Sequence, residues 1–263
     1  MLRSTSMASR AVRTSASRAD RHDSTVYPVE EKMGEDLLQR RIMELLRPLV
    51  ERWLAERGIT ALTGADQFVY FRRGDTRGRV APDVFVLPGV EPRRRIKSWK
   101  VWQQGIVPSF ALEVVSSDVD KDYIDAPALY RELGVGELVI FDPDWETDAD
   151  QPRFRFQVYR RVGRRGLVRV LVTNEDRVAS RKLGCHVRAV GTGDETRLRL
   201  ASGANGDDLV PTPDEEKERE RAEKERERAE KERERALRVA AEQEVRKLRA
   251  ENAMLRKQIP RRR

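Results

Sequence analysis

The feature that most limits how this chain can fold is the run of charged residues near its C-terminus. From Asp214 to Ile259 there is no glycine and no proline, and a seven-residue repeat of acidic and basic residues occupies 220–226 and again 227–233. Acidic residues lie four positions before basic ones, an orientation that stabilises a helix by ~0.2–0.5 kcal/mol per pair. Because alanines are the only apolar side chains in its first half, the segment is predicted as a solvated helix, and any hydrophobic core must come from the residues before it.

The second half of this run carries a short seven-residue periodicity. Two rows of side chains recur every seven residues: Ala241, Leu248 and Leu255, and Val245, Asn252 and Ile259. These rows match the a and d positions of a coiled coil, with Asn252 as a polar a position that favours a parallel dimer in register. Because the pattern lasts fewer than three heptads, a single solvated helix explains it equally well. A homodimer through residues 241–259 is therefore left open.

The net charge of the chain is carried mostly by its two ends. The chain has 263 residues and a formal charge of +8. Residues 214–263 contribute +4 and residues 1–26 contribute +3, which leaves +1 for residues 27–213. A basic chain usually indicates a nucleic-acid or membrane partner, but the middle of this chain is nearly neutral, so its function must be judged from its own side chains.

The composition excludes several classes of protein. Cys185 is the only cysteine, so no intrachain disulfide and no multi-cysteine zinc site is possible, and two histidines cannot supply a histidine-rich metal cluster. No stretch approaches the ~20 consecutive apolar residues of a spanning helix, so no membrane partner is expected. A reducing, cytoplasmic location is the expectation for such a chain.

The sequence divides into four segments. Residues 1–26 are rich in serine, threonine, alanine and arginine and are interpreted as a disordered leader, with a transit peptide as the alternative. Residues 27–206 are expected to form the folded domain and 207–213 a linker. Residues 214–263 are the charged helix or coiled coil.

The folded segment begins with a helical pattern and continues with strands. Apolar residues over 30–57 recur at helical spacing, with Pro48 expected to kink or divide the helix and Gly58 to end it. Apolar runs bounded by glycine, proline or charge then indicate strands, interrupted by a helical stretch at 120–133. The expected strands are 68–71, 80–87, 110–115, 137–141, 154–160, 167–172, 185–190 and 197–200. This order predicts an α/β fold with a mixed sheet and helices on its faces.

Two carboxylates stand inside this strand pattern. Asp83 follows Pro82 at the entry to an apolar strand, and Glu113 lies within Phe110–Val115. Side-chain alternation places Glu113 among apolar neighbours, where an ionised carboxylate is costly unless it is paired or bound to a cation. An aspartate and a glutamate on adjacent strands suit Mg²⁺ or Mn²⁺. The alternative is that Asp83 caps a turn and Glu113 pairs with a buried arginine.

Four strings of residues lie in order around these carboxylates. They are Val80-Ala81-Pro82-Asp83-Val84-Phe85-Val86, Leu112-Glu113-Val114-Val115-Ser116, Leu129-Tyr130-Arg131-Glu132-Leu133-Gly134-Val135 and Ile140-Phe141-Asp142-Pro143. Each string alone is a weak signal, but together, at this spacing, they resemble the Uma2 family of the PD-(D/E)XK nuclease superfamily, over residues 30–213. The resemblance implies a restriction-endonuclease-like fold, a mixed central sheet flanked by helices, here with a long charged C-terminal helix.

The resemblance also implies roles for individual residues. Asp83 and Glu113 would bind the metal, Mg²⁺ or Mn²⁺, and the substrate would be DNA. The first helix of the family often carries a glutamate and then a histidine; Glu35 matches the glutamate, and Gln39 stands at the histidine position. Glu35 either bridges to metal-bound water or is an exposed helix residue.

The lysine of the superfamily is displaced in this sequence. Val115 stands two residues after Glu113, where the superfamily lysine is found, and family members usually supply a lysine from the next helix, after an aspartate. Asp122 matches that aspartate, but Ala126 stands at the lysine position. Lys121 is the nearest substitute: it is either a catalytic group that offsets charge on the phosphate or an ordinary solvated lysine.

The sequence leaves three functions open. The first is a metal-dependent DNA endonuclease that hydrolyses phosphodiester bonds. The second is a catalytically inactive DNA-binding or scaffolding module that dimerises through the C-terminal coiled coil. The third is a coiled-coil interaction protein with a vestigial α/β domain. A cluster of basic and aromatic residues at 93–102 either contacts phosphates and bases or forms a solvated loop.

Overall fold

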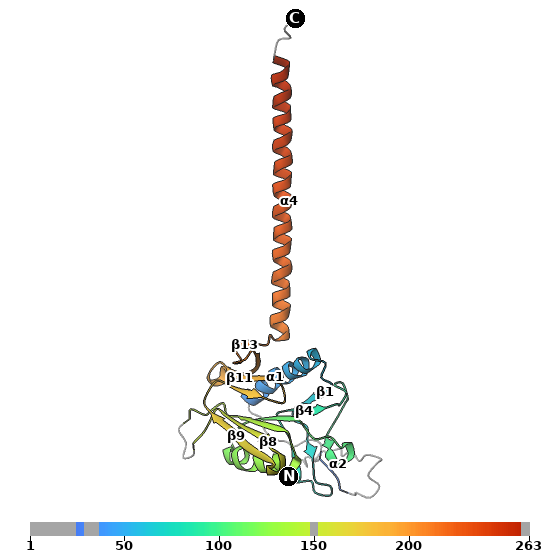
Figure 1. The fold of residues 1–263 in the computed structure, drawn as a ribbon, viewed down its shortest axis with the longest axis vertical. Helices are drawn as coiled ribbons and strands as arrows, with labels where there is room; N and C mark the ends of the chain where they lie inside the picture. The colour runs from blue at the N-terminus through green and yellow to red at the C-terminus, as the bar shows by residue number, and fades with distance from the viewer. Residues whose placement is uncertain (1–24, 29–36, 148–151, 259–263) are drawn as a thin grey trace, which may run out of the picture. The chain divides into compact units, whose positions relative to one another are not determined.

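The structure is a computed structural model, and it describes residues 25–28, 37–147 and 152–258. Within this range the chain forms two compact units: the folded unit, which runs to Val210, and the tail unit, which begins at Pro211. Figure 1 traces the elements of each unit. Among the described helices, none combines the length and the apolar composition needed to cross a membrane.

A mixed six-stranded sheet forms the centre of the folded unit, in the order β1-β4-β6-β7-β8-β9. Its strands are β1 (Ala61–Gly64), β4 (Val84–Pro88), β6 (Phe110–Val114), β7 (Glu137–Phe141), β8 (Phe156–Arg161) and β9 (Leu167–Thr173). The β6–β7 pair is parallel, and the other pairs are antiparallel. Parallel neighbours need a crossover, which here consists of the π-helical turn η1 (Lys121–Asp125) and helix α3 (Ala126–Leu133).

Two smaller sheets and two more helices complete the folded unit. One sheet has the order β10-β11-β12-β13, and the other has the order β3-β2-β5. Their strands are β2 (Val69–Tyr70), β3 (Arg79–Val80), β5 (Trp99–Lys100), β10 (Arg177–Ser180), β11 (Cys185–Val190), β12 (Arg197–Ser202) and β13 (Asp208–Leu209). The helices are α1 (Leu37–Glu56) and the short α2 (Val101–Gln104), and single 3₁₀ turns occur at η2 (Gly163–Arg165) and η3 (Gly193–Glu195).

The two faces of β6 enter two different hydrophobic cores, because side chains alternate along a strand. Phe110, Leu112 and Val114 belong to the core that also contains the buried face of α1 and residues of β10, β11 and β12. Ala111 belongs to the other core, together with Tyr130 of α3. In Figure 1, α1 and β11 lie on the same side of β8 and β9. The opposite side is called the α3 side below.

Helix α1 is continuous through Pro48, so the expectation that this proline divides the helix was wrong. Leu46, Leu49 and Val50 flank it and are fully buried. Their burial offsets the ~3 kcal/mol that a proline costs inside a helix. Just after the helix, Gly58 has a φ of 68°, the left-handed conformation that glycine adopts readily at a helix end.

Two buried carboxylates, at the two ends of β7, have arginine partners. Glu137 accepts hydrogen bonds from Arg160 Nε at 2.8 Å and from Ser180 Oγ at 2.6 Å, which joins the central sheet to β10. Asp142 accepts from both Nε and Nη2 of Arg153, at 2.8 and 2.6 Å. Because an ionised carboxylate is tolerated in the interior when it is paired and hydrogen-bonded, these two residues fit a structural role.

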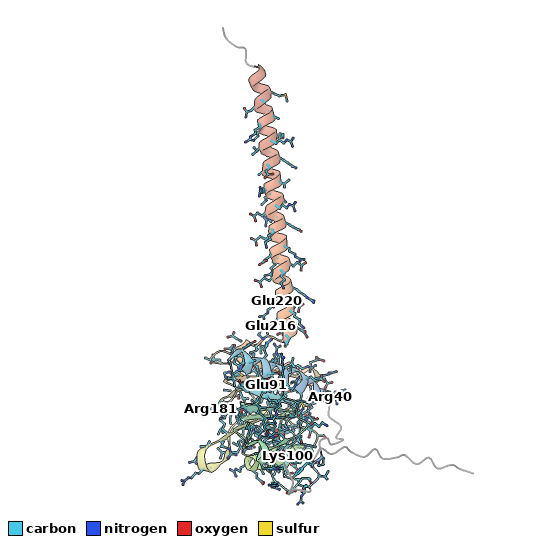
Figure 2. The ribbon with its side chains drawn as sticks, turned by 90° about the vertical axis from the view of Figure 1, so that its right-hand side faces the viewer. Arg40, Glu91, Lys100, Arg181, Glu216 and Glu220 are labelled. Carbon is cyan, nitrogen blue, oxygen red and sulfur yellow. The ribbon has the colours of Figure 1, made fainter. Side chains whose placement is uncertain are left out.

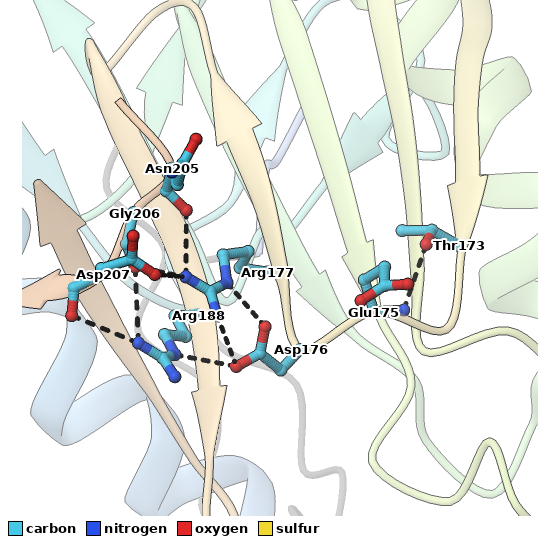
Figure 3. Close-up of polar contacts among 8 residues, drawn as sticks. All are labelled: Thr173, Glu175, Asp176, Arg177, Arg188, Asn205, Gly206 and Asp207. Carbon is cyan, nitrogen blue, oxygen red and sulfur yellow. Dashed lines mark hydrogen bonds and ion pairs between the residues drawn. The ribbon is translucent and has the colours of Figure 1, made fainter. Parts of the chain in front are cut away.

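A network of charged side chains ties the end of the folded unit to β10 and β11 (Figure 3). Asp176 accepts hydrogen bonds from Arg177 Nε at 2.7 Å and from Arg188 Nε at 2.9 Å. Both arginines also donate to backbone carbonyls of the loop before β13. The segment 207–213, expected to be a linker, thus contains a strand and the buried Val210, because these interactions hold it against the sheet.

The tail unit is a single helix, α4 (Pro213–Gln258), and no described side chain on it is buried. Figure 2 shows its side chains standing out on all sides. Thr212 Oγ1 accepts from Glu215 N at 3.2 Å, and the Glu215 carboxylate accepts from Thr212 N at 2.8 Å. This reciprocal pair is a capping box, and Pro213 suits the first helical position. The predicted fold class, α/β with a long charged C-terminal helix, is confirmed.

We expect the isolated segment 211–263 to be helical, because its capping box and a series of i,i+4 ion pairs lie within it. The pairs include Glu220 with Lys224 at 3.6 Å and Glu227 with Lys231 at 3.7 Å. Circular dichroism at low ionic strength should show helix, and high salt should reduce it because these exposed pairs are screened. A spectrum without helix at low salt would contradict the expectation.

Candidate metal centre

Strand register brings Asp83 and Glu113 together. β4 and β6 are antiparallel, and the pair at this end of the ladder is Val84 opposite Leu112. Asp83 immediately precedes β4 and Glu113 immediately follows Leu112 in β6, so the two residues are neighbours at the same end of this ladder. The backbone is consistent with this, since Val114 N donates a 2.6 Å hydrogen bond to Oδ2 of Asp83. The Glu113 carboxylate is held by α3, and the Asp83 carboxylate next to it contacts β6 and α1.

Asp83 is buried, with 4% of its surface exposed. Besides the bond from Val114, Oδ1 of Asp83 accepts a 2.8 Å hydrogen bond from Nε2 of Gln39 on α1. Burial raises the pKa of Asp83 to about 7, although both hydrogen bonds favour the ionised form. The negative charges of Asp122 and Asp66 raise this pKa further.

Glu113 is half-buried and is held by Tyr130 of α3, whose hydroxyl donates a 2.5 Å hydrogen bond to Oε1. Burial, and then the neighbouring Asp83 carboxylate, raise the pKa of Glu113 well above its usual range. The hydrogen bond from Tyr130 and the charge of Lys121 act in the opposite direction. Among the described residues, Oε2 of Glu113 has no hydrogen-bond partner, so this oxygen is available to a ligand.

The two site carboxylates differ from the two paired ones on β7 in one respect. Glu137 and Asp142 each form an ion pair with an arginine. Within the described part of the chain, neither Asp83 nor Glu113 has an arginine or lysine as an ion-pair partner. The alternative that Glu113 pairs with a buried arginine therefore finds no support among these residues, and no ion pair among them offsets the charge of either carboxylate.

The turn η1 is fixed next to this pair. Asp122 is buried and accepts hydrogen bonds from the backbone N and the Oγ of Ser116, at 2.7 and 2.9 Å. The hydroxyl of Tyr123 donates to Oδ2 of Asp142 at 2.7 Å, which ties the turn to the end of β7. Burial raises the pKa of Asp122. π-Helical turns are frequent at functional sites, because the extra residue redirects side chains.

Lys121 begins this turn, and its side chain is exposed. Its positive charge lowers the pKa of both Glu113 and Asp122, so the ammonium group lies within electrostatic reach of the two carboxylates. Ala126, at the family's lysine position, is buried on the α3 side one helical turn before Tyr130. Because residues four apart share a helix face, this position faces the same region as Tyr130.

Sequence reasoning did not assign roles to two residues that contact the site. Tyr130 was recognised only as part of a family string, and its position on an apolar helix face gave no sign of its contact with Glu113. Gln39 was noted at the family's histidine position, but its bond to Asp83 depends on how α1 packs on the sheet. Glu35, named as a candidate on the same helix, lies outside the described residues.

In the basic and aromatic cluster at 93–102, the ring of Trp99 is not available as a stacking platform. Trp99 is 1% exposed, and its Nε1 donates to the carbonyl of Ile106 at 2.9 Å. Lys100 is buried, with Nζ 4.3 Å from the centre of the Tyr27 ring. The basic residues before Trp99 are exposed, so this cluster is a charged loop over a packed interior.

The residues at the site fit a hard divalent cation. Mg²⁺ accepts oxygen ligands, keeps several waters and is commonly held by one or two carboxylates together with substrate phosphates. Asp83 and Glu113 supply two adjacent carboxylates, and burial, followed by the charges of neighbouring carboxylates, raises the pKa of both. The described residues contain no group of three or more His, Cys, Asp or Glu arranged to hold a metal, so the protein would leave much of the coordination to water and substrate.

The family of this α/β protein is identified by direct comparison. The chain belongs to the Uma2 family, described as "Putative restriction endonuclease", whose model matches residues 14–186. Among solved structures, the chain is similar to one described as "a putative nuclease belonging to DUF820" from Anabaena variabilis. The match has 15% identity and a TM-score of 0.40, and covers 61% of this chain and 79% of the other. A search of curated proteins found no match.

In the presence of EDTA, we expect the free energy of unfolding to fall as pH rises from about 4 to about 7. The pKa of Asp83 is raised by folding to about 7, so the folded state binds its proton more tightly, and this stabilisation is lost as pH rises through that value. Each pH unit in this window is worth at most ~1.4 kcal/mol. Urea denaturation at several pH values measures it.

Asp83→Asn should flatten this pH dependence and should be more stable than the parent at pH 8. The amide oxygen can accept from Val114 N, and the amide NH₂ can donate to Gln39 after its side-chain amide turns over. At pH 4 the two proteins should be similar in stability, because the parent carboxyl is then neutral. An unchanged slope in the variant would show that the titrating group lies elsewhere.

Proposed function

We propose that the folded unit is a divalent-metal-dependent endonuclease that hydrolyses DNA phosphodiester bonds, with Asp83 and Glu113 as the metal ligands. The observation that supports this most strongly is that Asp83, just before β4, and Glu113 of β6 lie at the same end of the β4–β6 ladder with no ion-pair partner among the described residues. Membership of the Uma2 family supplies the reaction class. Mg²⁺ is the proposed ion, and Mn²⁺ is its usual substitute in oxygen-ligand sites.

The residues around the pair have distinct tasks in this proposal. A bound divalent ion supplies Lewis-acid chemistry and a more acidic water. Gln39 and the backbone of Val114 hold the two oxygens of Asp83, and both bonds favour the ionised carboxylate that a metal requires. Tyr130 holds one oxygen of Glu113 and leaves the other toward the site. Lys121 places a positive charge nearby, where it offsets charge that develops on the phosphate.

A second candidate is a catalytically inactive DNA-binding or scaffolding module that dimerises through the tail. Two observations favour it: Ala126 replaces the family lysine, and α4 exposes about half of Val245 and of Leu248, which belong to the seven-residue rows. The mass of the protein in solution, with and without residues 214–263, tests the dimer. A metal titration monitored by calorimetry separates the nuclease from this module and from a coiled-coil protein with a vestigial domain.

Glu113→Ala should lower metal-dependent cleavage of DNA by at least roughly 100-fold, because a lost metal ligand removes several kcal/mol of transition-state stabilisation. The same change relieves a buried charge, so the thermal midpoint should not fall. The matched control is Glu146→Ala, which deletes an exposed carboxylate that has no part in the proposed site. This variant should cleave DNA like the parent. Equal cleavage by the Glu113 variant and the parent would place the activity elsewhere.

Lys121→Ala should reduce cleavage by roughly ten-fold or more if its charge stabilises the developing phosphate charge. Adding Ala126→Lys should restore part of the loss, because residue 126 shares the helix face of Tyr130 at the site. Cleavage rates of the single and double variants at saturating Mg²⁺ measure this. A parent that is inactive and becomes active through Ala126→Lys would instead identify a decayed nuclease.

A further inference from the structure

The β8–β9 hairpin carries the most one-sided charge in the folded unit. Residues 152–174 contain seven arginines and no aspartate, glutamate or lysine. Two of the seven, Arg153 and Arg160, are neutralised by the buried carboxylates of Asp142 and Glu137. Most of the others remain without a counter-charge, although residues 27–213 as a whole are nearly neutral.

A group of five arginines, called the arginine hairpin here, gathers on β8, β9, their turn and the end of α3. Its members are Arg131, Arg161, Arg164, Arg165 and Arg169. All five are exposed, and none of them forms an ion pair with another described residue. The acidic neighbour of Arg131, Glu132, is already paired with Arg72 on the other side of α3.

Three of these arginines are held by neutral groups. Nε of Arg161 donates to the carbonyls of Gly134 and Val135, both at 3.1 Å, at the C-terminal end of α3. Nε of Arg131 donates to the carbonyl of Leu167 at 3.0 Å. Such bonds fix the direction of a guanidinium group but do not cancel its charge, and they lower the entropy lost when the group binds an anion.

Arg169 follows the same pattern, because its Nη1 donates to the neutral amide oxygen of Gln157 at 3.2 Å. The remaining two arginines form the tip. Arg164 and Arg165 lie in the 3₁₀ turn between β8 and β9, flanked by Gly163 and Gly166, whose φ values of 47° and 73° permit the tight reversal. The tip therefore presents two fully charged guanidinium groups on a short rigid ribbon.

We infer that the arginine hairpin binds the phosphate backbone of duplex DNA outside the candidate metal centre. Duplex DNA is the partner that fits, since it offers regularly spaced phosphates to guanidinium groups that have no acid of their own. The inference rests on the proposed function for its choice of polyanion. The residues that carry it are separate from those assigned to chemistry.

The distance from the metal centre is compatible with one duplex reaching both places. Glu113 pairs with Ile140, and Ile140 pairs with Gln157, so Gln157 lies two strands across at the same level, roughly 10 Å away. The tip is about six residues further along β8, which gives a total of roughly 20–25 Å. At ~3.4 Å per base pair this is about six or seven base pairs, well within a short duplex.

Binding of a fluorescein-labelled 20-base-pair duplex, followed by anisotropy in EDTA over a series of salt concentrations, tests the inference without depending on metal or cleavage. The full chain with Arg164→Ala and Arg165→Ala should bind roughly ten-fold more weakly or worse at moderate salt. Its log–log salt slope should fall by about 2, one counterion released per lost phosphate contact. Arg164→Lys with Arg165→Lys should keep most of the salt slope, because the charge is retained.

The matched control is Arg233→Ala with Arg235→Ala on α4, which removes the same charge from exposed positions of the tail. It should leave affinity and slope unchanged. Circular dichroism and thermal midpoints confirm that each variant folds, and neither arginine of the tip has a side-chain hydrogen bond or ion pair to lose among the described residues.

Three outcomes would overturn the inference: no duplex binding by the parent, an unchanged affinity and slope in the tip variant, or an equal loss in the tail control. Tighter binding of a single-stranded RNA of the same length would also overturn it, in favour of another nucleic acid. A weakened tip variant in a parent that never cleaves DNA would support the inference and refute the proposed function. If the parent cleaves DNA and the tip variant binds the duplex as tightly as the parent, the proposed function is supported and the inference is refuted.

Discussion

The constraint on which the rest of the folded unit depends is the placement of two carboxylates, Asp83 and Glu113, next to each other where little solvent reaches them. The two residues lie at the same end of the β4–β6 ladder, and burial raises the pKa of both. Two like charges in one desolvated site oppose each other's ionisation. The ionised pair is therefore electrostatically unfavourable unless a cation binds. The packing of the surrounding elements must therefore offset the free-energy cost of keeping the two carboxylates together.

Three separate elements provide that support. Helix α1 contributes the bond from Gln39, strand β6 contributes its own backbone N–H, and α3 contributes the hydroxyl of Tyr130. None of these donors carries a charge, so they orient the carboxylates without neutralising them. By contrast, Glu137 and Asp142 receive arginines and connect β7 to its neighbours. The protein thus contains two kinds of buried acid, distinguished by their partners rather than by their depth.

The same distinction applies to the basic residues. Across residues 27–213 the formal charges almost cancel, yet the acidic side chains in that range are not distributed evenly among the arginines. Arg153, Arg177 and Arg188 are paired with aspartates, whereas three members of the arginine hairpin are held by carbonyls and one amide. Net charge is therefore a poor guide to this surface, since a nearly neutral domain can keep a local excess of positive charge when its acids are engaged elsewhere.

A structural feature could be predicted from the sequence when the interactions that produce it join residues close together in the chain. The tail helix follows from neighbours four apart and a capping box, the strands from alternation, and the family from four short strings, so all of these could be predicted. The same local signals also identified Asp83 and Glu113 as candidates, and the resemblance to the family added Lys121. Local rules misjudged one effect of Pro48, which does not divide the helix because burial of its neighbours outweighs local propensity there.

Only the tertiary structure decided the contacts between segments that lie far apart in the chain. Gln39 and Asp83 are separated by 44 positions, and Tyr130 and Glu113 by 17, and no periodicity encodes either bond. The burial of Trp99 and the choice of which arginines receive a carboxylate are likewise set by packing. The sequence by itself determined the local elements and the identity of the chemical groups. The pairing of strands and helices determined which groups meet, because strand register and helix packing depend on the whole core and not on any one segment.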